Sequence, residues 1–365
     1  MTLEAEILAS AEKLLVENEP QKDLLAQAFA WLRAPERAEP LFVALTADAL
    51  AQNGEERAFR GASLAFTMFT CRFVAHARAL AEEIGQMPLG SPNPDVRTRI
   101  GVEIASAFES TGQRGRSTVP LSIAGETVRE SSAGRRSFLL RMVLDLMTQT
   151  KHRDATATLA FAQPIAGDLF WVGDMGRFET RLGQLDRAWA RTERLLGHVG
   201  LAVLLGDLMD AAPDATDRLR DVLAQIENGH ERGTMLISAA RGIAHHPDHV
   251  SSTIELLDEG LARVADASPR ARYSAMVRAS EVFAEIGELG RAARLARESL
   301  ECMSGTSQED FSHNFGSTGR ALARAGERAA AHRLYLEKGR SATHWSRALL
   351  IRDIAFSFPE PPEEC

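Results

Sequence analysis

The sequence predicts an all-α protein built from repeated helical hairpins. Its apolar residues are mainly Ala and Leu, whereas Val, Ile, Tyr and Trp are sparse, and this composition favours helix over sheet. Apolar residues recur with the helical period, as in the segment SAMVRASEVFAEI at residues 274–286. A short junction also recurs, in which a glycine that can end a helix stands five positions before a small residue. These observations together predict a stack of antiparallel hairpins containing about 16–18 helices.

The junction is clearest at three places along the chain. It reads GQLDRA from Gly183, GELGRA from Gly287 and GERAAA from Gly326, with looser copies from Gly112 and Thr150. These five turn residues lie 38, 33, 104 and 39 positions apart. The longest interval fits three periods of about 35 residues, the length of a helical-hairpin repeat. Between about residues 190 and 270 the pattern does not fix the register.

Residues at fixed distances before each turn residue extend the pattern. Seven positions before it stands a small residue and four positions before it a large one. The small positions hold Ala105, Gly176, Ser280 and Gly319, and the large positions hold Phe108, Leu146, Phe283 and Leu322. Over about residues 96–358 this arrangement resembles the tetratricopeptide repeat, although Val143 at a small position and Glu179 at a large one depart from it. The resemblance implies a right-handed α-solenoid.

The regularity of the pattern predicts four segments along the chain. Residues 1–84 are expected to form an irregular N-terminal helical cap. The segment 85–96, GQMPLGSPNPDV, has the prolines and glycines of a linker. Residues 97–358 are expected to form the repeat array, and residues 359–365 a disordered acidic tail.

Composition narrows the classes of protein to which the chain could belong. A net charge of −8 and a pI near 5.8 argue against a nucleic-acid partner. Cys71, Cys302 and Cys365 are isolated from one another, which suits a reducing compartment and predicts neither a disulfide framework nor a zinc site. The N-terminus does not read as a signal peptide, and no apolar run predicts a membrane span. We therefore expect a cytoplasmic protein, and the dominance of arginine over lysine suggests a bacterial one.

Two segments carry residue types that can bind a metal ion. The segment HHPDH carries His245, His246 and His249, but Pro247 places them in a turn and no HExxH motif or cysteine accompanies them, so we expect an exposed loop. GDLMD at residues 206–210 is interpreted as an amphipathic helix end rather than a magnesium motif. Nucleotide-binding and nucleophile motifs are missing as well, so no catalytic residue, metal or cofactor is predicted.

The resemblance also implies where a partner would bind. In tetratricopeptide proteins, residues six and two positions before the turn residue line the concave groove. Among the residues at these positions, the candidates are Arg177, Arg181, Glu281, Glu285, Arg320 and Arg324. Members of the family hold acidic peptide tails with such basic pairs, because a guanidinium group can bind a carboxylate with two hydrogen bonds. The alternative is that these residues pair with one another as ordinary surface ion pairs.

The functional hypothesis follows from the groove. We expect a scaffold, an adaptor or a regulatory subunit of a bacterial complex, which recognises another protein or an acidic peptide through the concave groove. One alternative is an all-helical enzyme, either a repeat-fold hydrolase or a nucleic-acid-processing enzyme, with a concave active site. Another is a self-assembling structural protein, so a homo-oligomer also stays open.

Overall fold

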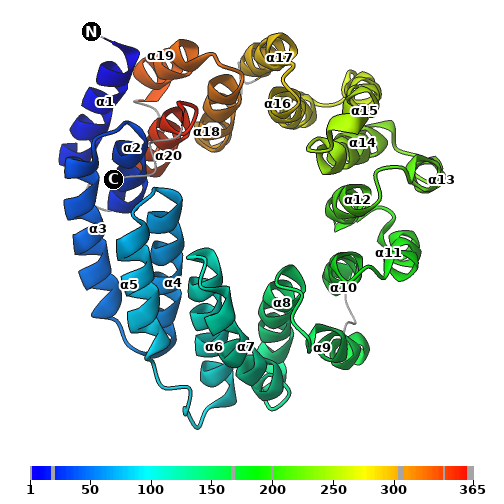
Figure 1. Ribbon diagram of the computed structural model, residues 1–365. Helices are drawn as coiled ribbons and strands as arrows, with labels where there is room; N and C mark the ends of the chain where they lie inside the picture. Colours follow the sequence, from blue (N-terminus) through cyan, green and yellow to red (C-terminus); the bar gives the residue numbers. More distant parts are fainter. Residues whose placement is uncertain are drawn as a thin grey trace. The chain divides into compact units, whose positions relative to one another are not determined.

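The computed structural model describes residues 2–17, 21–165, 169–198, 200–302, 308–339 and 342–359. Over these ranges the chain is all-α, with twenty α-helices, short 3-10 turns and no strand (Figure 1). The helix number exceeds the 16–18 that the sequence predicted. No helix in the described ranges is both long and apolar enough to cross a membrane. Apart from Pro359, the acidic tail expected at residues 359–365 lies outside the described residues.

The described helices fall into two compact units, which do not divide at residues 85–96. One unit comprises residues 22–167. Its helices are α2 (Lys22–Trp31), α3 (Pro35–Leu50), α4 (Gly54–Thr70), α5 (Val74–Gly85), α6 (Pro94–Ser110), α7 (Arg114–Thr127), α8 (Ala133–Gln149) and α9 (Ala155–Ala162). They pack as the consecutive hairpins α2–α3, α4–α5, α6–α7 and α8–α9. Helix α6 also packs against α4 and α5, so close packing continues across the segment expected to be a linker.

The other unit combines residues 1–21 with residues 168–359. Its helices are α1 (Leu3–Glu17), α10 (Leu169–Arg181), α11 (Leu185–Thr192), α12 (Gly200–Ala211), α13 (Thr216–Ala224), α14 (Gly229–Ile243), α15 (Val250–Val264), α16 (Pro269–Glu285), α17 (Leu289–Cys302), α18 (Gln308–Arg324), α19 (Arg328–Lys338) and α20 (His344–Ala355). Each even-numbered helix from α10 to α18 packs against the next even-numbered one. We call α10, α12, α14, α16, α18 and α20 the first helices of their hairpins, and α11, α13, α15, α17 and α19 the second helices.

Helix α20 is the final member of the first helices, and its partner comes from the opposite end of the chain. Helix α1 packs against α20 and buries Ile7, Ala11 and Leu14 (Figure 1). An ion pair of 3.1 Å between Glu17 and Arg347 joins the same two helices. The N-terminal helix therefore belongs to the C-terminal end of this unit.

Seven described connections between paired helices share one turn. In each, a residue with positive φ ends the first helix, and the next N–H donates to the carbonyl five positions earlier over 2.7–2.9 Å. The positive-φ residues are Arg33, Arg72, Gly112, Lys151, Gly183, Gly287 and Gly326. The residues four positions before them are all buried: Phe29, Met68, Phe108, Met147, Glu179, Phe283 and Leu322. A large side chain packs under each turn and holds the two helices together.

These turns confirm four of the five predicted turn residues and correct the fifth. Thr150 has φ −87°, whereas Lys151 adopts the left-handed conformation with φ 52°. The large position therefore falls on Met147 rather than Leu146, and the small position shifts from Val143 to Leu144. Arginine and lysine adopt this conformation only at some steric cost, so their presence in a turn hides the pattern that glycine reveals.

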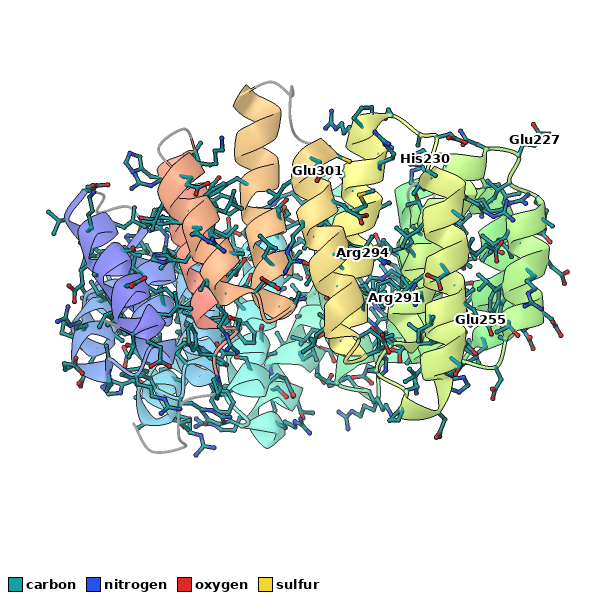
Figure 2. All side chains as sticks on the ribbon, turned by 90° about the horizontal axis from the view of Figure 1, so that it is seen from above. Glu227, His230, Glu255, Arg291, Arg294 and Glu301 are labelled. Atoms are coloured by element: carbon teal, nitrogen blue, oxygen red, sulfur yellow. The ribbon has the colours of Figure 1, made fainter. Side chains whose placement is uncertain are left out.

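Ion pairs between the later helices of consecutive hairpins, α5 and α7 in one unit and the second helices in the other, repeat with the hairpins. They join Glu82 with Arg116, Asp186 with Arg218, and Asp258 with Arg291, whose partners lie 34, 32 and 33 residues apart. Figure 2 labels Arg291 and Arg294 on α17. The guanidinium groups of Arg116 and Arg291 also lie over the buried rings of Phe108 and Phe283, 4.6 and 4.2 Å from the ring centroids. Equivalent residues in both units thus make equivalent contacts, as expected for a helical repeat.

Glu179 explains the departure at one large position. Its side chain is fully buried and accepts two hydrogen bonds, of 2.6 and 2.7 Å, from the guanidinium group of Arg191 on α11. The other large positions hold apolar side chains. At this junction a buried ion pair joins the two helices in place of an apolar contact.

Candidate functional site

Helices α12 and α14 approach each other closely at two glycines. A Cβ atom on Gly242 of α14 would collide with the main chain of Gly206 on α12. A Cβ atom on Gly206 would in turn lie 3.2 Å from the carbonyl oxygen of Ser238. Because neither glycine has a side chain, the two helices approach closely and leave the surface above them hollow.

This hollow has a volume of about 550 Å³ and is lined by the first helices α10, α12, α14 and α16, together with His245 just after α14. Apolar side chains from Ala202, Ile237 and Val282 line part of it. Its charged and titratable residues are Arg177, Asp207, Asp210, Arg241, His245 and Arg278. A volume of a few hundred Å³ with a mixed lining suits a small ligand or a short peptide segment.

The arginines around the hollow differ in how they are paired. The Nε of Arg177 donates to Asp207 at 2.7 Å, so its charge is already compensated. Arg241 and Arg278 are exposed, and neither forms an ion pair or a hydrogen bond with any described residue. Each therefore keeps its full set of guanidinium donors for an anion.

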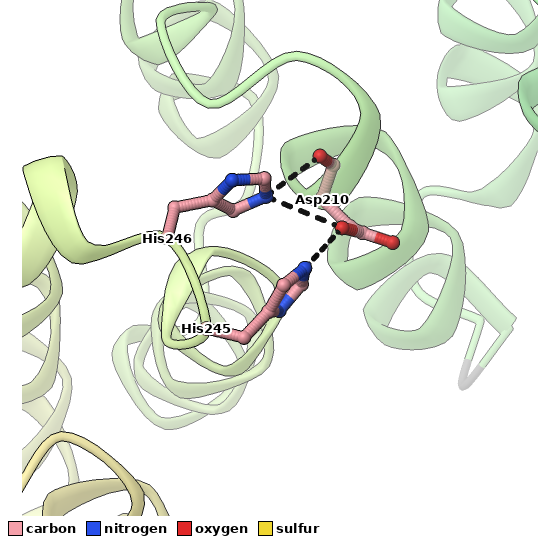
Figure 3. A group of neighbouring side chains, drawn as sticks. All are labelled: Asp210, His245 and His246. Carbon is pink, nitrogen blue, oxygen red and sulfur yellow. Dashed lines mark hydrogen bonds and ion pairs between the residues drawn. The ribbon is translucent and has the colours of Figure 1, made fainter.

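A cluster of two histidines and one aspartate lies at the edge of the hollow (Figure 3). Asp210 lies near the end of α12, and His245 and His246 follow the end of α14. The Nε2 of His245 lies 2.7 Å from Asp210 Oδ1. The Nε2 of His246 lies 3.3 Å from the same oxygen and 3.0 Å from the Asp210 carbonyl oxygen. The local sequence around the histidines and around Asp210 does not predict this juxtaposition.

A signal for the cluster was nevertheless present in the sequence. Asp210 and His246 are 36 residues apart, which is one repeat period. Residues one period apart occupy equivalent places on neighbouring hairpins, and the ends of neighbouring first helices lie side by side. Because the repeat pattern does not fix the register between about residues 190 and 270, this relation becomes visible only in the fold.

The structure places the six predicted groove residues in different surroundings. Arg177 lines the hollow and is paired with Asp207. Glu281 and Arg320 form an ion pair of 2.8 Å between α16 and α18, as the alternative hypothesis expected for neighbouring helices. Arg181 is half-buried, whereas Glu285 and Arg324 are exposed. Binding of a partner by any of the six stays a prediction.

Arg320 and Arg324 also influence a buried carboxylate on α20. Burial has the largest influence on Asp353 and raises its pKa. The charge of the neighbouring Arg352 opposes this rise most strongly. The charges of Arg320 and Arg324 act in the same direction as that of Arg352 and lower this pKa. Both groove arginines therefore already compensate charge within the unit.

The unit of residues 22–167 contains a serine, a histidine and an aspartate close together. Ser122 Oγ lies 3.4 Å from His152 Nε2 and 3.3 Å from Asp154 Oδ2. However, His152 Nδ1 accepts a hydrogen bond of 3.3 Å from the main-chain N–H of Asp154. In the neutral ring Nε2 then carries the proton, so it cannot take one from Ser122. The arrangement lacks the base that a nucleophilic serine requires.

The sequence matches no known protein family and no curated protein. The fold and the hollow define an all-helical protein of paired helices, with a histidine–aspartate cluster and two arginines that pair with no described residue around one hollow.

Proposed function

We propose that the protein is an adaptor that holds an acidic segment of another protein in the hollow between α10, α12, α14 and α16. In this proposal the paired helices form a right-handed α-solenoid similar to tetratricopeptide proteins, with the first helices on its concave side. The repeated turns, the packing of successive first helices and the periodic ion pairs between second helices support such an array.

The single observation that carries the proposal is the pair of unpaired arginines, Arg241 and Arg278. The chain as a whole is acidic, with a net charge of −8, yet these two cations line one hollow and form no ion pair with any residue that the structure describes. A guanidinium group binds a carboxylate through two parallel hydrogen bonds, and two such groups suit neighbouring acidic side chains or a C-terminal carboxylate. The apolar lining would receive the aliphatic part of the same segment.

A peptide-selection experiment tests this function. The immobilised full-length protein is used to select ligands from a library of random peptides, and the selected peptides are sequenced and their affinities measured. We expect enrichment of Asp, Glu or a free C-terminal carboxylate. The double variant Arg241→Glu, Arg278→Glu should weaken binding by about tenfold or more, because like charges then meet across the interface.

The matched control changes the net charge equally on the second helices. Arg294 on α17 and Arg333 on α19 are exposed, and Arg294→Glu with Arg333→Glu introduces the same four-unit change in charge. Affinity should stay near that of the original chain. Equal losses in both double variants, or selected peptides without acidic character, would refute the proposed site.

A further inference from the structure

We propose that Asp210, His245 and His246 form a binding site for a divalent transition-metal ion, for which Zn²⁺ is the fitting ion. The proposal goes beyond peptide binding and does not depend on it. One ligand atom of each residue lies within 4.8 Å of those of the other two. The three residues come from two hairpins, so the fold rather than the local sequence brings these donors together.

Two of the three distances between donor atoms, those from the imidazoles to Asp210, are near those that a metal would impose, and the third is at most 4.8 Å. Tetrahedral Zn²⁺ with bonds of about 2.0–2.1 Å holds its ligand atoms about 3.3 Å apart. The separation of His246 Nε2 from Asp210 Oδ1 is already 3.3 Å. His245 Nε2, at 2.7 Å from the same oxygen, must move outward by about half an ångström to reach that spacing. About half of the surface of the His245 and Asp210 side chains is exposed, at 51% and 53%, so both can make this adjustment.

The chemistry of the donors selects the class of ion. Two imidazole nitrogens and one carboxylate oxygen suit Zn²⁺ and its first-row neighbours, whereas Mg²⁺ and Ca²⁺ prefer sets of oxygen ligands. Both imidazoles must present Nε2 without its proton, so in each neutral ring the proton that now serves the hydrogen bond to Asp210 moves to Nδ1 when the ion binds. Three protein ligands leave a fourth position of the tetrahedron for water or another ligand.

The fourth position would open toward the hollow. Asp210 and His245 line the hollow as well as belonging to the cluster. An ion held between them would add positive charge beside Arg241 and Arg278. A metal ion at this site could therefore also bind an anion. Binding of the metal alone is sufficient to test the site.

Metal titration of the full-length, untagged protein tests the site. After dialysis against a chelator, calorimetry with Zn²⁺ should give one equivalent bound, and Mg²⁺ should give none. The variants Asp210→Asn, His245→Ala and His246→Ala should each weaken Zn²⁺ binding by at least about tenfold, because each removes one of three ligands. His249→Ala is the matched control, since His249 lies in the same connection, pairs with Asp214 at 3.8 Å and is not part of the cluster.

Cobalt absorption spectroscopy identifies the ligands independently of affinity. Co²⁺ bound by imidazole and carboxylate should show visible bands, without the strong near-ultraviolet absorption of thiolate ligands. These bands should disappear in His245→Ala and His246→Ala and persist in His249→Ala. The proposal is overturned if Zn²⁺ does not bind, if thiolate absorption accompanies binding, or if His249→Ala weakens binding as much as the three ligand variants do. The first outcome would mean a hydrogen-bonded cluster only.

Discussion

The hairpins α16–α17 and α18–α19 differ from the hairpins α12–α13 and α14–α15 in the way that their helices are joined. In the first group Gly287 and Gly326 adopt positive φ and close the turn with the same hydrogen bond. No residue from 211 to 250 has positive φ, and the connection after α14 contains a 3-10 turn at Pro247–His249. In the second group the glycines lie instead at a helix contact, where Gly206 meets Gly242.

This difference separates two uses of the same residue type. At Gly287 the glycine serves the backbone conformation of the turn, and a Cβ atom there would meet nothing within 4 Å. At Gly242 the backbone is an ordinary helix, and the glycine serves the approach of a neighbouring helix. The histidine cluster and Arg241 lie in the second group, whereas Arg278 reaches the hollow from α16 of the first group. Regions that depart from a repeat pattern are where functional residues are expected.

The largest effect is expected at the regular junction that holds a buried ion pair. Replacement of Arg191 by Leu leaves the fully buried carboxylate of Glu179 without its partner. We expect the free energy of unfolding to fall by about 3–5 kcal/mol, the usual result of breaking a buried pair from one side. Urea unfolding followed by circular dichroism measures this loss.

A second variant shows whether the stability of this junction requires the buried ion pair or only side chains that fill the same volume. The double replacement Glu179→Phe, Arg191→Leu gives this junction the kind of apolar contact that Phe108 and Phe283 make at theirs. Most of the lost stability should return, since an apolar pair of similar volume can replace a buried ion pair. If the double variant is as unstable as Arg191→Leu, the large positions of the junctions are not equivalent and the comparison among hairpins weakens.

A smaller effect is expected when the two kinds of glycine are compared directly. Gly242→Ala forces a methyl group against the main chain of Gly206 and should cost about 1–3 kcal/mol, as overpacking does. Gly287→Ala meets no neighbour, but it places a Cβ atom at φ 82° and should cost about 1 kcal/mol. Both are measured by urea unfolding of matched alanine variants. A larger loss at Gly287 would contradict the distinction between turn and contact glycines.

The sequence predicted the regular junctions well and the central hairpins poorly for a physical reason. Glycine at a left-handed position is a local requirement, so Gly112, Gly183, Gly287 and Gly326 could be found from their neighbours alone. The contact of Gly206 with Gly242 depends on two helices 36 residues apart, and nothing in either local segment requires it. The same is true of Asp210 and His246, which meet only after the hairpins pack. Arg177 lines the hollow, but its pairing with Asp207 could not be foreseen without the register of α12.

The C-terminal end of this unit departs from the regular hairpins in a third way, because the partner of α20 is α1, from the other end of the chain. His332 on α19 is buried beside α1, with its Nε2 3.1 Å from Ser10 Oγ and its Nδ1 3.9 Å from Glu6. Its ring stacks with that of Tyr335 at a centroid distance of 6.0 Å. Because His332 is buried against α1, a positive charge on its ring should loosen the packing of α1.

The smallest effect should therefore appear as a dependence on pH. Burial lowers the pKa of His332 below its ordinary value of 6.5, and the charge of Glu6 only partly opposes this shift. As the pH falls below 6.5, the histidine of the unfolded chain takes up a proton before that of the folded chain. The stability due to the neutral ring is therefore complete above pH 6.5. It is lost as the pH falls through the lower pKa that His332 has in the folded protein. We expect hydrogen exchange of α1 amides, corrected for intrinsic rates, to quicken as the pH falls below about 6.5. His332→Gln should remove much of this dependence and His249→Gln should leave it unchanged. An identical pH profile in the His332 variant would mean that other groups hold α1 in place, and that this hairpin differs from the others only in the order of its chain.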